Sequence, residues 1–151
     1  MRKTTESVFR MSLSYDLRST MDKRSLGWGA GFLFLAVAFG AFGAHALKAV
    51  LNTDQLGQWH TAVQYQFYHG LGLMFLALAG GQLPSRSVRA VRTLFVAGVW
   101  LFCGSIYLLS TRELLGLEAA TSLLGPITPL GGLCFLGGWI VLLITAVRRT
   151  D

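Results

Sequence analysis

Residues 26–46 read LGWGAGFLFLAVAFGAFGAHA, a run of about 20 residues without Asp, Glu, Lys or Arg. At the 1.5 Å rise of an α-helix, such a run extends about 30 Å, which is the thickness of a bilayer's hydrocarbon core. Three more apolar stretches of similar length follow at residues 62–81, 90–110 and 129–147, and none of the four contains an acidic residue. This pattern predicts an all-α membrane protein with four transmembrane helices in an antiparallel bundle.

The composition of the whole chain favours the same class. Of its 151 residues 53% are hydrophobic and 13% are charged, and the mean hydropathy is +0.54. In soluble domains about 25% of residues are charged, so lipid is the expected solvent for most of this chain. The sequence pI of about 9.9 does not indicate nucleic-acid binding, because the basic residues flank apolar stretches instead of forming one face. The predicted environment is therefore a lipid bilayer, without a nucleic-acid partner.

Positive charge is divided unevenly between the connecting segments. Eleven of the 13 Lys and Arg residues lie in the N-terminal tail, around the connector between the second and third stretches, or after the fourth. The other two, Lys48 and Arg112, lie in the first and third connectors. Because basic segments stay on the cytoplasmic side, we expect a multi-pass protein of a bacterial inner membrane with both termini in the cytoplasm.

The two ends of the chain differ from the apolar stretches. Residues 1–25 are polar, mixed in charge and without helical periodicity, which predicts a disordered N-terminal tail, and Met11 and Met21 are alternative starts. Residues 148–151 form a short tail that we expect in the cytoplasm. A second interpretation takes residues 26–46 as a secretory signal, with 44–46 (AHA) as its cleavage site. The apolar run is longer than the usual signal core of about 7 to 15 residues, which favours a span.

Small residues and caps predict how the helices pack and where they begin. Close approach of small residues helps to drive helix association in lipid. Residues 26–47 carry two such stripes: Gly27, Gly31, Phe34, Ala38, Ala41 and His45 on one, and Ala36, Gly40, Gly43 and Leu47 on the other. Together the stripes predict neighbours on both sides of this helix. We expect Asn52 or Thr53 to cap the second helix, and Thr128 to cap the fourth with Pro129 at its first position.

Several short motifs recur in order along the chain: GAFGAH at 40–45 followed by Leu47 and Lys48, YQFYH at 65–69, GSIY at 104–107, GPITPLGG at 125–132 and GW at 138–139. They resemble the signatures of the YgdD-like family of small inner-membrane proteins, catalogued as domain of unknown function 423. The resemblance covers about residues 26–147, whereas residues 1–20 depart from it because family members begin close to the first helix. It implies a four-helix bacterial inner-membrane protein and supplies no catalytic residues.

All three histidines, His45, His60 and His69, fall in the predicted outer half, which raises a metal or haem hypothesis. The expected heights of His45 and His69 differ by roughly 10 Å, too much for two axial ligands of one iron. Lys48 places a cation beside any metal bound at His45. We therefore expect no metal and no cofactor.

The favoured interpretation of His69 is structural. We expect it to form a hydrogen bond across helices, to Ser105, Tyr107 or a backbone carbonyl, because such bonds orient helices in membranes. Cys103 and Cys134 lie mid-stretch without metal-binding spacing and are interpreted as small hydrophobic residues.

Other chemistries find little support. The four stretches lack the carboxylate that proton-coupled export needs. No base is predicted near Ser105, and the sequence contains no G-x-S-x-G elbow and no phosphate-binding loop, so we expect no enzymatic activity. The leucine-rich connector at residues 111–124 predicts a short helix in the outer interface.

The sequence thus favours a non-enzymatic accessory or assembly protein that acts through helix packing, with another membrane protein or a second copy as partner. The alternative is binding or transport of a small ligand or metal through an outer-half pocket around His45, Tyr65 and His69. The candidate functional residues are His45, Lys48, Tyr65, Gln66, His69, Ser105, Tyr107 and Thr128.

Overall fold

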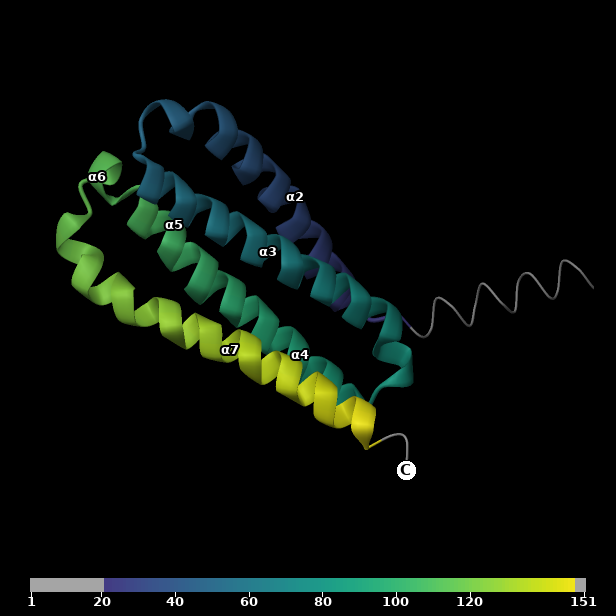
Figure 1. Ribbon diagram of the computed structural model, residues 1–151. Helices are drawn as coiled ribbons and strands as arrows, with labels where there is room; N and C mark the ends of the chain where they lie inside the picture. The colour runs from purple at the N-terminus through teal and green to yellow at the C-terminus, as the bar shows by residue number, and fades with distance from the viewer. Residues whose placement is uncertain (1–20, 149–151) are drawn as a thin grey trace, which may run out of the picture.

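The computed structural model describes residues 21–148, and this part of the chain is built from helices and turns without a strand. Its long helical segments are α2 (Lys23–His45), α3 (Thr53–Ala79), a composite third segment and α7 (Thr121–Val147) (Figure 1). The third segment joins α4 (Ser85–Gly98), the π-helix η3 (Val99–Cys103) and α5 (Gly104–Ser110). Short turns connect them: η1 (Leu47–Ala49), η2 (Gly80–Gln82), α6 (Arg112–Leu115) and η4 (Glu118–Ala120).

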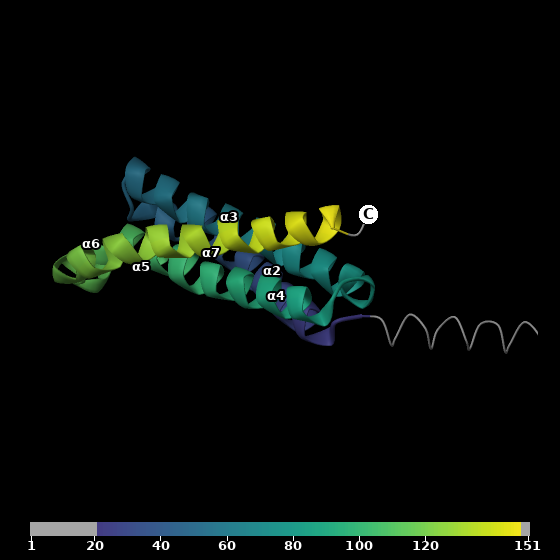
Figure 2. The same cartoon turned by 90° about the horizontal axis from the view of Figure 1, so that it is seen from below.

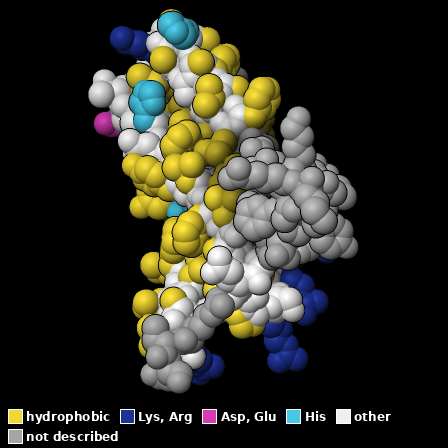
Figure 3. All heavy atoms as spheres, turned by 90° about the vertical axis from the view of Figure 1, so that its right-hand side faces the viewer, with side chains coloured by type: hydrophobic (Ala, Val, Ile, Leu, Met, Phe, Trp, Pro, Cys, Tyr) yellow, Lys and Arg dark blue, Asp and Glu magenta, His cyan; other side chains and the backbone are white. Residues whose placement is uncertain are grey.

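The long segments run side by side along one common direction (Figures 1 and 2). Helix α2 packs chiefly on α3, α3 packs on α5 and η3, and α7 packs on α4 and η3. The start of α2, the η2 turn and the end of α7 lie at one end of the molecule, and η1 and α6 lie at the other. Hydrophobic side chains cover much of the face in Figure 3. The expected all-helical class is therefore confirmed for residues 21–148.

Within residues 21–148, three segments are long and apolar enough to cross a membrane: Lys23–Ala49, Ser85–Ser110 and Thr121–Val147. Helix α3 does not reach this hydropathy, although it has 27 residues. Its first two thirds carry Gln58, Gln64, Gln66 and His69, which lower the average. A span count of four therefore stays a prediction.

The helices begin earlier than the apolar stretches. Helix α2 starts at Lys23, inside the segment expected to be a disordered tail, and residues 1–20 and 149–151 lie outside the described part. The expected cap of the second helix is confirmed. Asn52 Oδ1 accepts from the Gln55 backbone N–H at 2.9 Å, and Gln55 Oε1 accepts from the Asn52 N–H at 3.1 Å. This reciprocal pair is a capping box.

The expected cap of the fourth helix is wrong. Helix α7 begins at Thr121, so Pro126 and Pro129 lie inside it, and the Thr128 hydroxyl donates back to the Leu124 carbonyl at 3.4 Å. Proline is tolerated inside membrane helices because nearby hydroxyls and neighbouring helices satisfy the freed backbone groups. The leucine-rich connector contains the short helix α6, in which Leu114 and Leu115 are exposed.

The expectation of neighbours on both sides of α2 is also wrong within this chain. The stripe with Ala36, Gly43 and Leu47 is buried, and a Cβ on Gly43 would come within 2.7 Å of the Trp59 ring. The other stripe faces outward: a Cβ on Gly27 or Gly31 would meet nothing within 4 Å. Small residues on a helix mark only a potential contact, and here one stripe is left to the surroundings of the protein.

Candidate functional site

The structure divides the eight candidate residues among three hydrogen-bonded groups and one exposed helix end. His69 bonds to the Tyr65 backbone carbonyl and to Trp139 of α7, Gln66 pairs with Tyr107, and Ser105 pairs with Thr128. His45 and Lys48 are exposed at the end of α2 and in η1.

Both ring nitrogens of His69 are occupied. Trp139 Nε1 donates to His69 Nε2 at 3.2 Å, and His69 Nδ1 lies 2.8 Å from the Tyr65 carbonyl oxygen. Because the indole N–H can only donate, Nε2 must be the acceptor, and Nδ1–H then donates to the carbonyl. The side chain is 5% exposed and is a neutral imidazole in this arrangement. A metal would have to displace one of these two bonds.

The cross-helix hydrogen bond expected of His69 is present, but its partner is Trp139 instead of Ser105 or Tyr107. The His69 ring also stacks on Phe135, with centroids 3.5 Å apart and planes 12° apart. Glycines make room for this stack, since a Cβ on Gly98 would overlap the Phe135 ring and one on Gly138 would overlap Phe95. The sequence signal for this partner was a tryptophan at mid-span, whose indole N–H needs an acceptor away from water.

A groove of about 500 Å³ opens beside this stack, between α3, η3 and α7. Its lining is mostly aromatic and aliphatic: Tyr65, His69, Phe102, Pro129, Gly132, Leu133, Phe135, Leu136 and Trp139. The Tyr65 ring is 39% exposed, and its hydroxyl makes no hydrogen bond within the described part of the chain. His45 does not line this groove.

The second group ties three helical segments together. Gln66 is 3% exposed; its Nε2 donates to the Phe32 carbonyl of α2 at 3.0 Å, and its Oε1 accepts from the Tyr107 hydroxyl of α5 at 3.0 Å. Beside it Trp59 Nε1 donates to the Phe39 carbonyl at 2.9 Å. The amide is therefore satisfied on both sides, as a polar group at this depth requires.

The third group lies at the π-helix η3. Ser105 Oγ donates to the Phe102 carbonyl at 3.0 Å and lies 2.7 Å from Thr128 Oγ1 of α7. The backbone of Phe102 comes so close to α7 that a Cβ on Gly131 would lie 2.7 Å from Phe102 Cα. The Ser105 hydroxyl thus joins two helices, and its recorded partners are a hydroxyl and a carbonyl instead of a base.

The side chains that could bind a metal ion do not cluster. Among residues 21–148 no three His, Cys, Asp or Glu side chains lie together as they would around a metal ion. Cys103 is buried, and Cys134 is half-buried with a free thiol.

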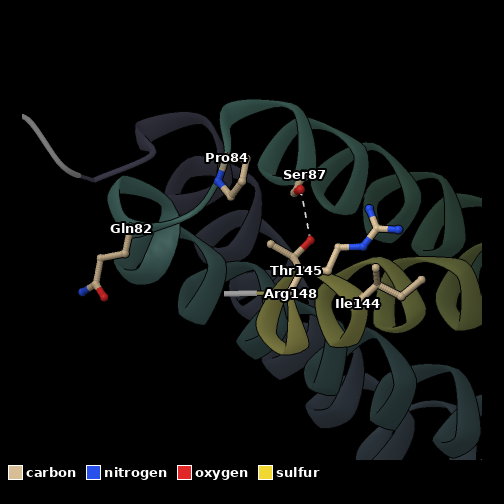
Figure 4. Close-up of a pocket in the computed structure, with 6 residues that line it drawn as sticks. All are labelled: Gln82, Pro84, Ser87, Ile144, Thr145 and Arg148. Atoms are coloured by element: carbon tan, nitrogen blue, oxygen red, sulfur yellow. Dashed lines mark hydrogen bonds between the residues drawn. The ribbon is translucent and has the colours of Figure 1, made fainter. Parts of the chain in front are cut away.

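A cavity of about 420 Å³ lies at the opposite end of α7, between the end of that helix and the start of α4. Figure 4 shows the Thr145 hydroxyl of α7 directed at Ser87 of α4, to which it donates at 3.0 Å. The cavity contains one cation, Arg148, and is otherwise neutral.

Comparison with known proteins places this arrangement in a family. Residues 39–132 match the family model described as "Protein of unknown function (DUF423)". The chain is 43% identical over 121 residues to the UPF0382 membrane protein YwdK of Bacillus subtilis, covering 80% of this chain and 93% of that protein. It is 35% identical over 119 residues to the UPF0382 inner membrane protein YgdD of Escherichia coli, covering 79% of this chain and 84% of that protein.

No solved structure matches the chain. The match to the family model covers more than half of the chain, and relatives from distant bacteria align over most of their length. The protein belongs to the DUF423 family of membrane proteins.

Proposed function

We propose that this protein is a non-enzymatic accessory protein of a bacterial inner membrane, and that the groove beside His69 binds an apolar helix of another membrane protein. The membrane placement agrees with the relatives, one of which is named an inner membrane protein. The accessory role is supported by the hydrogen bonding of the polar side chains between the helices. His69, Gln66, Ser105 and Tyr107 are all hydrogen-bonded to other parts of the fold, so their polar atoms act as structural links.

The observation that carries the proposal is the Tyr65 hydroxyl. It belongs to a side chain that lines the groove and lacks a hydrogen-bond partner within the described residues. An unpaired hydroxyl in an apolar environment costs roughly 2 kcal/mol or more. A hydrocarbon chain cannot pair with it, whereas a Ser, Thr or backbone group of another helix can.

The walls of the groove suit a helix. Gly132 and Pro129 form part of the α7 wall. Gly132 has no side chain, and a Cβ added to it would still be 3.8 Å from the Phe102 ring, so the groove has free space at this position. Leu133 and Leu136 are exposed beside it, at 62% and 60%. Small residues flanked by larger apolar ones let two helix backbones approach closely, which is how helices associate in lipid.

A photo-crosslinking experiment tests this proposal. A benzophenone side chain is placed at Leu136, which lines the groove, or at Leu143, which is 64% exposed on the same helix but does not line it. Irradiation of native membranes should give one protein adduct of discrete mass from position 136 and none from position 143. Lipid adducts alone at both positions, or an adduct whose mass is that of a dimer of this chain, would contradict the proposed partner.

A second candidate function is binding of a small amphiphilic molecule in the same groove. The volume of about 500 Å³ favours it, because ligand sites usually enclose about 300 to 1,000 Å³ with few polar groups. Native mass spectrometry of the purified protein separates the two functions. A bound species of constant small mass that is lost in Tyr65→Phe supports the ligand, whereas the wild-type chain without such a species supports the partner helix.

The proposed topology has four spans, with both termini in the cytoplasm. Its support is the distribution of charge. Among the described residues, Lys23, Arg24, Arg86, Arg89, Arg92 and Arg148 lie toward the end of the molecule where α2 begins and α7 ends, and Lys48 and Arg112 lie toward the other. Such an excess of basic residues is typical of the cytoplasmic side.

A further inference from the structure

A second cavity, of about 370 Å³, lies at the end of the molecule where α2 and α4 begin. It is built from the start of α2, the η2 turn and the first turns of α4. The side chains that give it its character are Asp22, Arg24, Ser85, Val88, Arg89 and Arg92. This cavity is separate from the groove beside His69, and the family comparison assigns nothing to it.

One of its three guanidinium groups is already paired. Arg92 Nη1 donates to Asp22 Oδ2, which also accepts from the Ser25 hydroxyl at 2.6 Å. Burial of Asp22 opposes its ionisation, but the bonds from Ser25 and Arg92 together hold the pKa of the carboxyl below its usual value. Arg92 and Asp22 therefore form a fixed, neutral pair that holds the start of α2 against α4.

The other two guanidinium groups are available. Arg24 and Arg89 are exposed, line the same cavity from two different helices, and form no ion pair with any side chain that the structure describes. Once Asp22 and Arg92 have neutralised each other, the cavity keeps two positive charges. Arg24 and Arg89 line one cavity, and guanidinium groups placed together in this way are typical of sites that bind a phosphate.

The surroundings of this cavity point to the source of such a phosphate. Two of the helices apolar enough to cross a membrane, Lys23–Ala49 and Ser85–Ser110, begin at this cavity, so it lies where a span ends and the headgroup region begins. Val88, which is 5% exposed, and the exposed Ser85 line the same cavity as the arginines. Positive charge beside the end of an apolar span complements an anionic phospholipid, whose phosphate lies next to its hydrocarbon chains.

We propose that this cavity binds the headgroup phosphate of an anionic phospholipid between Arg24 and Arg89. The Asp22–Arg92 pair acts as a positioning element, because it fixes α2 against α4 and so sets the separation of the two binding arginines. The volume of about 370 Å³ accommodates a phosphate together with its glycerol group. One lipid per chain is expected.

The chain offers a closely matched control for a test. Lys23 is the neighbour of Arg24, and Arg86 precedes Arg89 by one helical turn; both are exposed and neither lines the cavity. The double variant Arg24→Gln/Arg89→Gln and the double variant Lys23→Gln/Arg86→Gln therefore remove the same charge from the same end of the protein. Both leave the Asp22–Arg92 pair intact, and the unfolding midpoint without lipid reports whether each variant is folded.

The measurement is retention of phosphatidylglycerol by the full chain in native mass spectrometry, with phosphatidylcholine as the comparison lipid. The wild-type chain and Lys23→Gln/Arg86→Gln should retain one phosphatidylglycerol with similar affinity, and Arg24→Gln/Arg89→Gln should bind it at least about tenfold more weakly. Equal losses in the two double variants would overturn the site in favour of diffuse attraction. Equal retention of phosphatidylcholine would also overturn it, because the charge would then not be recognised.

A second arm separates the lipid from a free anion. Inorganic phosphate, titrated up to the concentration at which phosphatidylglycerol saturates the protein, should leave the unfolding midpoint unchanged while the lipid raises it. An equal rise with inorganic phosphate alone, lost in Arg24→Gln/Arg89→Gln, would overturn the lipid assignment and identify a site for a soluble anion.

Discussion

Gly131→Ala is expected to lower the unfolding midpoint of the detergent-solubilised protein by about 10 °C and to reduce its yield. The Cβ of the new alanine would lie 2.7 Å from Phe102 Cα, against the backbone of the π-helix η3. Backbone cannot rotate away as a side chain can, so α7 must shift or η3 must rearrange. Such overpacking costs about 1 to 3 kcal/mol.

The neighbouring glycine supplies the control. At Gly132 the nearest atoms to a new Cβ are the Phe102 ring carbons, at 3.8 and 3.9 Å, which is ordinary contact distance. Gly132→Ala should therefore leave the midpoint within about 2 °C of the wild type or raise it, because alanine favours the helix over glycine. Thermal unfolding followed by circular dichroism measures both variants. Equal midpoints for Gly131→Ala and Gly132→Ala would show that η3 and α7 are not packed as described.

Gln66→Ala is expected to cost about 2 to 3 kcal/mol of unfolding free energy, because it removes two hydrogen bonds that join α3 to its neighbours. The Tyr107 hydroxyl loses its acceptor and the Phe32 carbonyl loses a donor, each 3.0 Å from a polar atom of the Gln66 side chain. Gln64→Ala is the control, since Gln64 is exposed on the same helix two residues earlier. Its effect should stay within about 0.5 kcal/mol.

A third variant separates hydrogen bonding from packing. Tyr107→Phe keeps the ring that packs on Trp59 at 4.6 Å and on Phe39 at 5.0 Å, and it removes only the hydroxyl. Its cost should be about half that of Gln66→Ala. The account of this network is contradicted if Gln66→Ala and Gln64→Ala unfold at the same denaturant concentration.

Local features of this fold could be predicted from sequence. The apolar stretches predicted the long segments, and the choice of Asn52 or Thr53 as cap predicted the start of α3, where Asn52 is the cap. The start of α7 was missed because a proline was interpreted as a first helical residue. The leucine-rich stretch before it in fact continues the helix back to Thr121.

The partners across the fold could not be predicted. Trp139 lies 70 residues from His69, and the sequence gives no distance between them. The π-helix η3 could not be predicted either, because its sequence VWLFC is as apolar as an ordinary α-helical span. The glycines did not reveal which of them lie at close contacts: a Cβ on Gly131 would meet the Phe102 backbone, whereas one on Gly27 or Gly31 would meet nothing within 4 Å.

The mean hydropathy of helix α3 is lowered by polar residues on both of its faces. Its polar side chains Gln55, Gln66 and His69 are buried, at 4%, 3% and 5% exposure. They lie on the face that packs within the fold. The exposed face is polar in the first half of the helix, at Gln58, His60 and Gln64, and apolar in the second half, at Leu71, Phe75 and Leu78. The candidate site depends on this helix, because Tyr65, Gln66 and His69 reach mid-membrane only if α3 crosses the bilayer.

Cysteine accessibility tests the crossing of α3 directly. In a chain with Cys103 and Cys134 replaced by alanine, single cysteines are placed at Val50, which is 58% exposed before α3, and at Ser85, which is exposed after it. A membrane-impermeant maleimide added to spheroplasts should label the cysteine at position 50 at once, and the one at position 85 only after the membrane is permeabilised. Equal labelling of both positions in intact spheroplasts would place them on the same side and contradict a membrane-crossing α3.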